Sequence, residues 1–151
     1  MYKPKKILVP SDFSEFSNNA IQKAADIAEE YGAQIILLHV ISSDIQQCAD
    51  QYCLSADLMR QFEEESIRVS KENMEKAAGS ITSSRGIDVV FDIKKGIPSD
   101  VILAEQKKND VDLIVIASHG RTGVEKLLMG SVAEKVVRGA DCPVMVIKKG
   151  S

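Results

Sequence analysis

The chain has 151 residues, a formal net charge of −3 at neutral pH and a sequence pI of about 5.4. This length fits one domain, residues 1–151, which can bury a sizeable core without disulfides or metals. The slight acidity argues against nucleic-acid binding, which needs a basic field, and no apolar stretch is long enough for a membrane span or a signal peptide. We therefore expect a cytoplasmic protein.

Short apolar runs alternate with longer helical patterns from the start of the chain. The first strand is expected at residues 7–9, and a helix follows from Ser17 to Tyr31. Residues 35–40 form a continuous apolar run, which is typical of a strand buried on both faces. Residues 41–55 lose this pattern and indicate a loop.

The rest of the chain continues the alternation. A long amphipathic helix is expected to end near Gly79, and its inward-facing side chains are predicted to be Leu58, Met59, Phe62, Val69, Met74 and Ala77. Further strands are expected at 89–93, 113–116 and 144–147. A turn at 96–99 is expected to lead into a helix that carries Val101, Ile102 and Ala104, and a last helix is expected at 131–138. This order predicts a single-domain α/β fold, with a five-stranded, mainly parallel sheet and helices on both faces.

The cysteines do not indicate a disulfide framework or a zinc site. Cys48, Cys53 and Cys142 are an odd number of thiols, and none of them forms a C-x-x-C pair. No metal-ligating residues are therefore assigned.

Candidate binding residues lie where strands end, because ligands of open α/β sheets bind beyond the carboxyl ends of the strands. Residues 10–12, 40–41 and 117–120 occupy such positions. Asp12 can cap the next helix or contact a ligand, and the turn alone leaves both roles open.

The segment from Ala117 to Val132 carries the most chemical information. Gly120 and Gly130 permit close approach of the backbone to a ligand, and Ser131 opens a helix whose free N–H groups attract an anion. The strand–loop–helix context favours a phosphate site over a plain loop. Arg121 has two open roles, a contact to a triphosphate or a solvated surface charge.

These residues resemble the nucleotide-binding motif of the universal stress proteins, G-x-x-G, nine residues, then G-S/T. Here the motif runs from Ala117-x-x-Gly120 through residues 121–129 to Gly130-Ser131, so an alanine replaces its first glycine. The resemblance covers essentially the whole chain, since similar strands occur at residues 7–14, 37–40 and 142–147.

The resemblance implies a Rossmann-like fold of the adenine nucleotide alpha hydrolase type that binds ATP or AMP, with Mg²⁺ held through the phosphates. The residues that would border the adenine and ribose are Pro10, Ser11, Asp12 and Val40. Those that would line the ribose and first phosphate are Ile116, Ala117 and Gly120, and those that would hold the remaining phosphates are Gly130, Ser131, Val132 and Ala133. The family also implies homodimers through the last strand, Val144 to Ile147.

The expected function is adenine-nucleotide binding in a stress response, coupled to an unidentified protein partner, without a catalytic residue. One alternative is a slow ATPase or phosphotransferase in the same pocket, for which the sequence offers only His119 and Asp12. Another is an interaction module that binds no nucleotide, which the retained Gly120, Gly130 and Ser131 disfavour.

Other nucleotide and hydrolase motifs do not occur in the chain. There is no Walker A sequence, no G-x-G-x-x-G after a strand and no G-x-S-x-G elbow. Ser118 and His119 are not expected to form a nucleophilic pair, because adjacent loop residues rarely adopt that geometry. His39 is expected to be a hydrogen-bonded core histidine.

Overall fold

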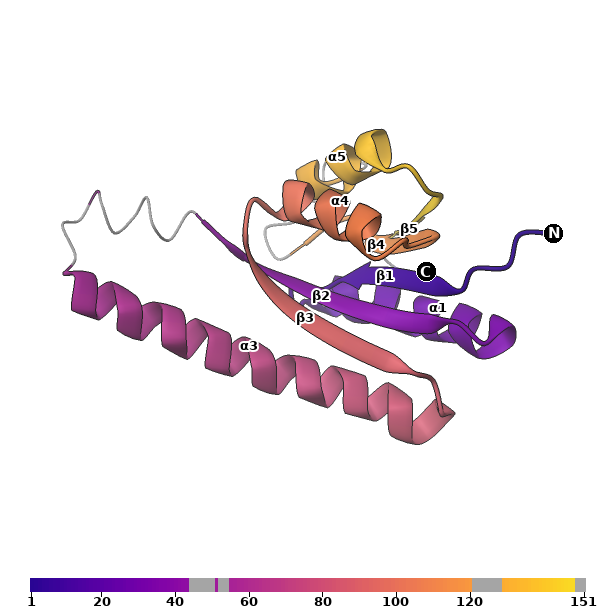
Figure 1. Ribbon diagram of the computed structural model, residues 1–151, viewed down its shortest axis with the longest axis horizontal. Helices are drawn as coiled ribbons and strands as arrows, with labels where there is room; N and C mark the ends of the chain where they lie inside the picture. The colour runs from indigo at the N-terminus through magenta and orange to yellow at the C-terminus, as the bar shows by residue number, and fades with distance from the viewer. Residues whose placement is uncertain (44–50, 52–54, 121–128, 149–151) are drawn as a thin grey trace.

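The computed structural model describes residues 1–43, 51, 55–120 and 129–148. Within these residues the strands form one five-stranded sheet of order β3-β2-β1-β4-β5, in which every neighbouring pair is parallel. The strands are β1 (Lys6–Pro10), β2 (Gln34–Ser42), β3 (Val89–Gly96), β4 (Leu113–Ala117) and β5 (Val144–Ile147). Figure 1 shows the sheet with β1 at its centre.

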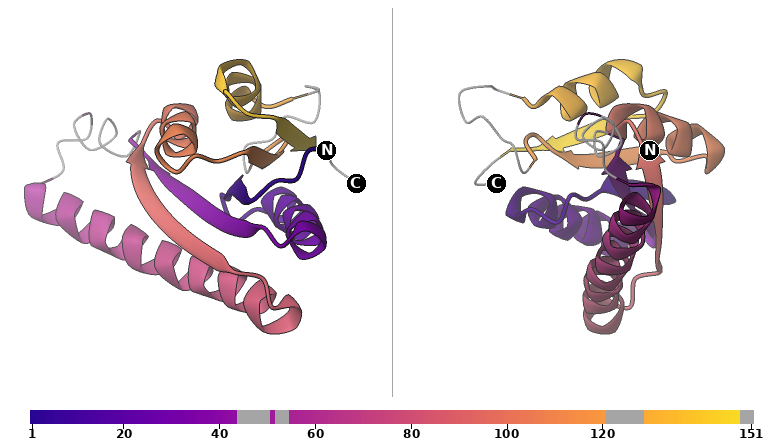
Figure 2. Two further views of the ribbon diagram at one scale, coloured as in Figure 1. Left: turned by 45° about the vertical axis from the view of Figure 1, so that its right-hand side comes forward. Right: turned by 90° about the vertical axis from the view of Figure 1, so that its left-hand side faces the viewer.

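Helices cover both faces of the sheet. Figure 2 shows α1 and α3 on one face and α4 and α5 on the other. Their bounds are α1 (Glu15–Tyr31), α3 (Ala56–Arg85), α4 (Pro98–Lys108) and α5 (Ser131–Gly139). The predicted fold class is therefore confirmed, and the sheet is parallel throughout the described residues.

The apolar runs of the strands follow from this two-sided covering. Ile7 and Val9 enter the core beneath α1 and α3, while Leu8 between them enters the core beneath α4. Successive side chains of a strand point to opposite faces, so a strand covered on both sides is apolar at every position.

Helix α3 differs from its prediction in length and in its inward face. It continues through Gly79 to Arg85 and ends where Gly86 adopts a left-handed φ of 67°. Met74 is fully buried as expected, but Leu58, Phe62 and Val69 are 38, 53 and 41% exposed. The prediction for these three residues was wrong: α3 begins beyond the end of the sheet (Figure 1), and this part of its apolar stripe stays largely exposed.

The loop expected at residues 41–55 is also shorter at its start. Strand β2 continues to Ser42, paired with Gly96 of β3. Residues 44–50 and 52–54, including Cys48 and Cys53, lie outside the described part of the chain.

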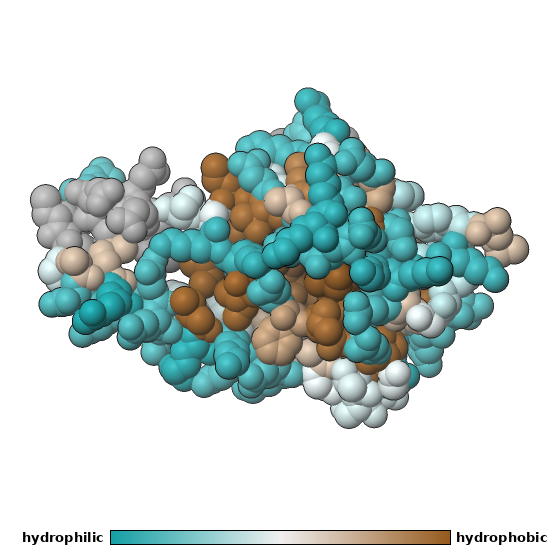
Figure 3. Space-filling model, in the orientation of Figure 1, coloured by the Kyte–Doolittle hydropathy of each residue, from teal (hydrophilic) through white to brown (hydrophobic). Residues whose placement is uncertain are grey.

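The two edges of the sheet are β3 and β5. Apolar side chains gather along β3 on the face shown in Figure 3, where Val90 is 43% exposed, between hydrophilic surfaces. Lysines protect this edge, since Lys95 pairs with Glu63 of α3 and Lys94 lies 3.4 Å from Asp92. None of the described helices is long and apolar enough to cross a membrane.

Candidate functional site

The strand order creates a cleft between the carboxyl ends of β1 and β4. After β1 the chain turns into α1 on one face, and the helix that follows β4 in the described chain, α5, lies on the other face. The connections therefore diverge at this point, which is where open α/β sheets bind ligands. A cleft of about 520 Å³ opens there, within the usual range for small-molecule sites.

One wall of the cleft is apolar. Pro10 closes β1, Val40 comes from β2 and Ile116 from β4, and all three were predicted site residues. Leu38 of β2 and Ile102 of α4 complete the wall, and each is only 1% exposed. Such a wall suits a flat, largely apolar ring system.

The opposite wall brings two turns together at Asp12 and Gly120. Asp12 Oδ1 accepts a hydrogen bond from the Ser14 N–H at 3.0 Å, so this carboxylate stabilises the turn into α1. Its Oδ2 lies 2.5 Å from the place that a Cβ on Gly120 would occupy. The turn after β4 can therefore approach Asp12 this closely only with glycine at position 120.

The start of α5 forms the end of the cleft. The Gly130 N–H donates to the Ser118 carbonyl at 2.6 Å, which ties the helix start to the end of β4. Gly130 is the N-cap and has no side chain to cap the first turn, and the first intrahelical bond runs from Glu134 N–H to Gly130. Among the described residues no side chain caps this helix start, so the N–H groups of Ser131, Val132 and Ala133, which line the cleft, are available to an anion.

A compact turn supports the floor beside Asp12. The Phe13 N–H donates to Ser11 Oγ at 3.2 Å, and Phe13 has a left-handed φ of 65°. His39 Nδ1 lies 2.7 Å from the Ser11 carbonyl, and the His39 ring stacks against the Phe13 ring at 4.3 Å. Because a carbonyl only accepts, Nδ1 carries the proton. The predicted hydrogen bond of His39 is therefore confirmed, but its side chain is only partly buried rather than part of the core.

Ser118 and His119 contact each other within the cleft. Ser118 Oγ lies 3.0 Å from His119 Nδ1, within hydrogen-bond distance. Both residues line the cleft, but Ser118 is only 2% exposed. The contact orients the imidazole, and the expectation that the two residues do not act as a nucleophilic pair stays a prediction.

The cleft gathers nearly all of the predicted binding residues. Those that line it are Pro10, Ser11, Asp12, Val40, Ile116, Ala117, Gly120, Gly130, Ser131, Val132 and Ala133. Arg121 lies outside the described residues. Sequence reasoning missed Ser17, Leu38, Ser42, Pro98 and Ile102, which also line the cleft. Pro98 and Ile102 belong to α4, which packs against β2 and β3, and no local motif signals that this helix reaches the cleft.

The described residues offer no metal centre of their own. No group of three or more His, Cys, Asp or Glu side chains within them is placed to hold a metal ion. Cys142 is a free thiol, and burial, with a smaller contribution from Asp112, raises its pKa above the usual value. The protonated form therefore dominates at neutral pH, which makes Cys142 a poor nucleophile.

The parallel sheet, its cleft and the helix N-terminus together define an α/β protein whose cleft has the geometry to suit an anionic ligand. A family model described as "Universal stress protein family" matches residues 3–148. Universal stress protein MJ0531 of Methanocaldococcus jannaschii is 32% identical over 148 residues, which cover 96% of this chain and 82% of the relative. The chain belongs to the universal stress protein family.

Solved structures are similar over the same length. Universal stress protein MJ0577 of Methanocaldococcus jannaschii is 32% identical to this chain over 154 residues. Its solved structure superposes with a TM-score of 0.86 over 99% of both chains, with 29% sequence identity in the structural alignment. A universal stress protein from Archaeoglobus fulgidus in complex with dAMP has a TM-score of 0.68 and 23% identity, covering 97% of this chain and 100% of that one. This second likeness, at lower identity, shows the shared fold.

Proposed function

We propose that this chain binds ATP or AMP in the cleft between β1 and β4 and acts as a nucleotide-dependent stress-response module rather than as an enzyme. The observation that carries the proposal is the free N-terminus of α5 at one end of a cleft whose other wall is apolar. This pairing matches a nucleotide, which has an aromatic base at one end and phosphates at the other. A related protein of the same fold binds dAMP, which supports the proposal.

The arrangement assigns a role to each part of the cleft. The adenine lies against Pro10, Val40 and Ile116, and Asp12 Oδ2 accepts a hydrogen bond from the ribose. The phosphates are held by the N–H groups at the start of α5, and a Mg²⁺ ion is bound through the phosphates rather than by a protein cluster. Arg121 is proposed to reach the outer phosphates.

The proposal is tested by measuring binding and turnover on the same preparation. Calorimetry with ATP, ADP and AMP, with and without Mg²⁺, should show saturable binding that depends on the number of phosphates. Phosphate release should be far slower than the roughly 1–10³ s⁻¹ of typical enzymes. Turnover at about 1 s⁻¹ or faster would favour the alternative, an enzyme that acts on ATP in the same pocket, for which the sequence offers only His119 and Asp12. The absence of binding by all three nucleotides would refute the proposed function.

We also propose that the protein is a cytoplasmic homodimer, paired through β5, and that the nucleotide state is read by a protein partner. Ile114 N–H donates to the Pro143 carbonyl and Ser118 N–H to the Ile147 carbonyl. Since backbone groups alternate in direction along a parallel strand, the N–H and carbonyl of Val146 point away from β4 to the open edge. Two such edges can pair antiparallel about a twofold axis.

Val146→Pro tests this interface without removing a bond of the β4–β5 ladder. The substitution should convert the dimer to a monomer, because it removes an edge N–H from each protomer. Sedimentation velocity measures the change, circular dichroism checks the fold, and Val146→Ala, which keeps the N–H, is the control. A wild-type protein that is monomeric well above micromolar concentration would exclude the interface.

A further inference from the structure

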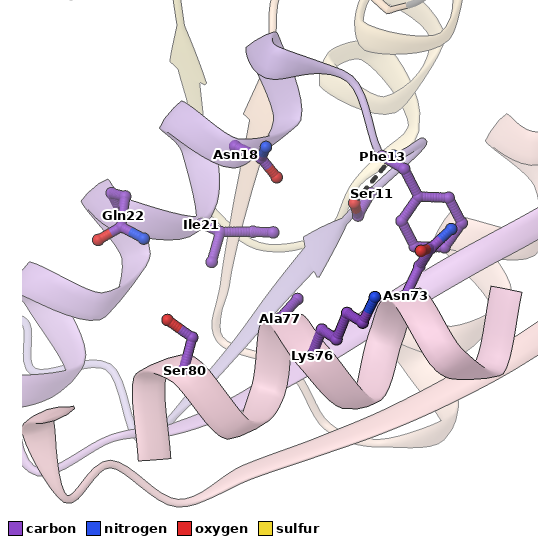
Figure 4. A pocket seen from close by; sticks show the side chains of 9 residues that line it. All are labelled: Ser11, Phe13, Asn18, Ile21, Gln22, Asn73, Lys76, Ala77 and Ser80. Atoms are coloured by element: carbon purple, nitrogen blue, oxygen red, sulfur yellow. Dashed lines mark hydrogen bonds between the residues drawn. The ribbon is translucent and has the colours of Figure 1, made fainter. Parts of the chain in front are cut away.

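A second cavity lies between α1 and α3, on the face of the sheet opposite α4 and α5. It is a groove of about 530 Å³ and is shown in Figure 4. Asn18 and Gln22 project into it from α1, and Asn73, Lys76 and Ser80 from α3 (Figure 4).

The polar side chains of this groove are not engaged elsewhere. Asn18, Gln22, Asn73 and Lys76 make no side-chain hydrogen bond or ion pair within the described part of the chain. Among the described residues that line the groove, Lys76 is the only charged one. The groove therefore presents three primary amides and a single ammonium group to whatever occupies it.

We propose that this groove binds a short extended peptide segment of a partner protein that carries one carboxylate. A primary amide donates and accepts hydrogen bonds at once, which is what the alternating N–H and carbonyl groups of an extended backbone require. The ammonium of Lys76 pairs with the carboxylate. A phosphate-rich polyanion fits poorly, because only one cation lines the groove and the protein carries a net charge of −3.

The dimensions of the groove set the length of the segment. Asn73 and Ser80 are seven positions apart on α3, a span of about 10 Å at roughly 1.5 Å per residue. An extended chain covers that span with about three residues at roughly 3.3 Å each. In Figure 4, Asn73 and the end of Lys76 lie towards Phe13, which places the carboxylate at that end of the groove.

The groove shares a wall with the cleft between β1 and β4. Ser11 lines both cavities, Asp12 lines the cleft and Phe13 lines the groove. One hydrogen-bonded turn thus separates the two sites. The proposal extends to a coupling of peptide and nucleotide binding through this turn, a step that rests on the proposed nucleotide function.

The groove is tested first without nucleotide, on the full-length chain labelled with ¹⁵N. The probe is the capped peptide Ac-Ala-Glu-Ala-NH₂, compared with Ac-Ala-Gln-Ala-NH₂ and with glutarate. The Glu peptide should shift the side-chain amide signals of Asn18 and Asn73 in a saturable way and bind about three- to fivefold tighter than the Gln peptide. Lys76→Ala should remove this difference, and Lys71→Ala, on the same helix but outside the groove, should leave it unchanged.

The alternative outcomes are equally specific. The proposal would be overturned if the Glu peptide caused no saturable shift of the amide signals. It would also be overturned if Lys76→Ala and Lys71→Ala reduced the affinity difference between the Glu and Gln peptides equally. Glutarate binding as tightly as the Glu peptide would assign the groove to small dicarboxylates and overturn the peptide part.

The coupling is tested by repeating the Glu titration with saturating ATP. The peptide Kd should change about threefold or more, and the ATP Kd should change by the same factor when the peptide is present. An unchanged Kd would overturn the coupling. If ATP does not bind, the coupling fails together with the proposed function, while the titration without nucleotide still decides the groove.

Discussion

The cleft and the groove have nearly equal volumes, about 520 and 530 Å³, but they are built in different ways. The polar side of the cleft is built mainly from backbone and short residues at strand ends and at the start of α5. The groove is lined by long polar side chains on two helices. Backbone has little freedom to adapt, whereas a long side chain can move. Substitutions that obstruct the backbone should therefore weaken binding in the cleft more than side-chain substitutions weaken it in the groove.

Gly130→Val should have the largest effect on the cleft. A Cβ at this position would lie 3.1 Å from the Ser118 carbonyl oxygen, and the branched methyl groups would occupy the space in front of the α5 N-terminus. We expect ATP binding to weaken about 100-fold or more, roughly 2.7 kcal/mol, by calorimetry.

The fold of this variant needs a matched control. Gly79→Ala places a methyl group on exposed α3, where nothing lies within 4 Å, and should leave ATP binding unchanged. A Gly130→Val protein with a native circular dichroism spectrum and unchanged ATP affinity would show that the phosphates lie elsewhere.

Gly120→Ala tests the contact between the two turns of the cleft. The added methyl would lie 2.5 Å from Asp12 Oδ2, so the carboxylate must leave its position. We expect ATP affinity to fall about tenfold, roughly 1.4 kcal/mol. A double-mutant cycle isolates the cause, because Asp12→Ala removes the clashing group. In the Asp12→Ala background, Gly120→Ala should reduce ATP affinity much less than in the wild type. An equal loss of ATP affinity in both backgrounds would refute the proposed contact.

The contrast between the cavities also explains what could be predicted from the sequence. The fold followed from strand runs such as residues 35–40, whose side chains must be apolar on both faces. The described motif positions meet in one cleft because the parallel topology brings the ends of β1 and β4 together. That they contact a nucleotide stays a prediction.

Contacts that depend on the packing of helices had no local signal. Ile102 joins the cleft only because α4 packs against the sheet beside β2 and β3. Similarly, the stripe at Leu58, Phe62 and Val69 has helical periodicity, but periodicity shows only that a helix has an apolar face. It does not show whether a surface covers that face, and these three side chains stay largely exposed.

Ala117→Gly should have the smallest effect, although it restores the glycine of the family motif. Ala117 is the last residue of β4, in register with Ile147, and its side chain packs against the core beneath α1 and α3. Its φ is not positive, so the backbone does not need glycine there. We expect ATP affinity by calorimetry to stay within about twofold, and the free energy of unfolding to fall by roughly 0.5–1 kcal/mol because glycine is more flexible in the unfolded chain. A tenfold gain in affinity would instead mean that the methyl group obstructs the ribose. In that case the Ala117 side chain would weaken ATP binding. Binding in the cleft would then depend on side chains as well as on the backbone.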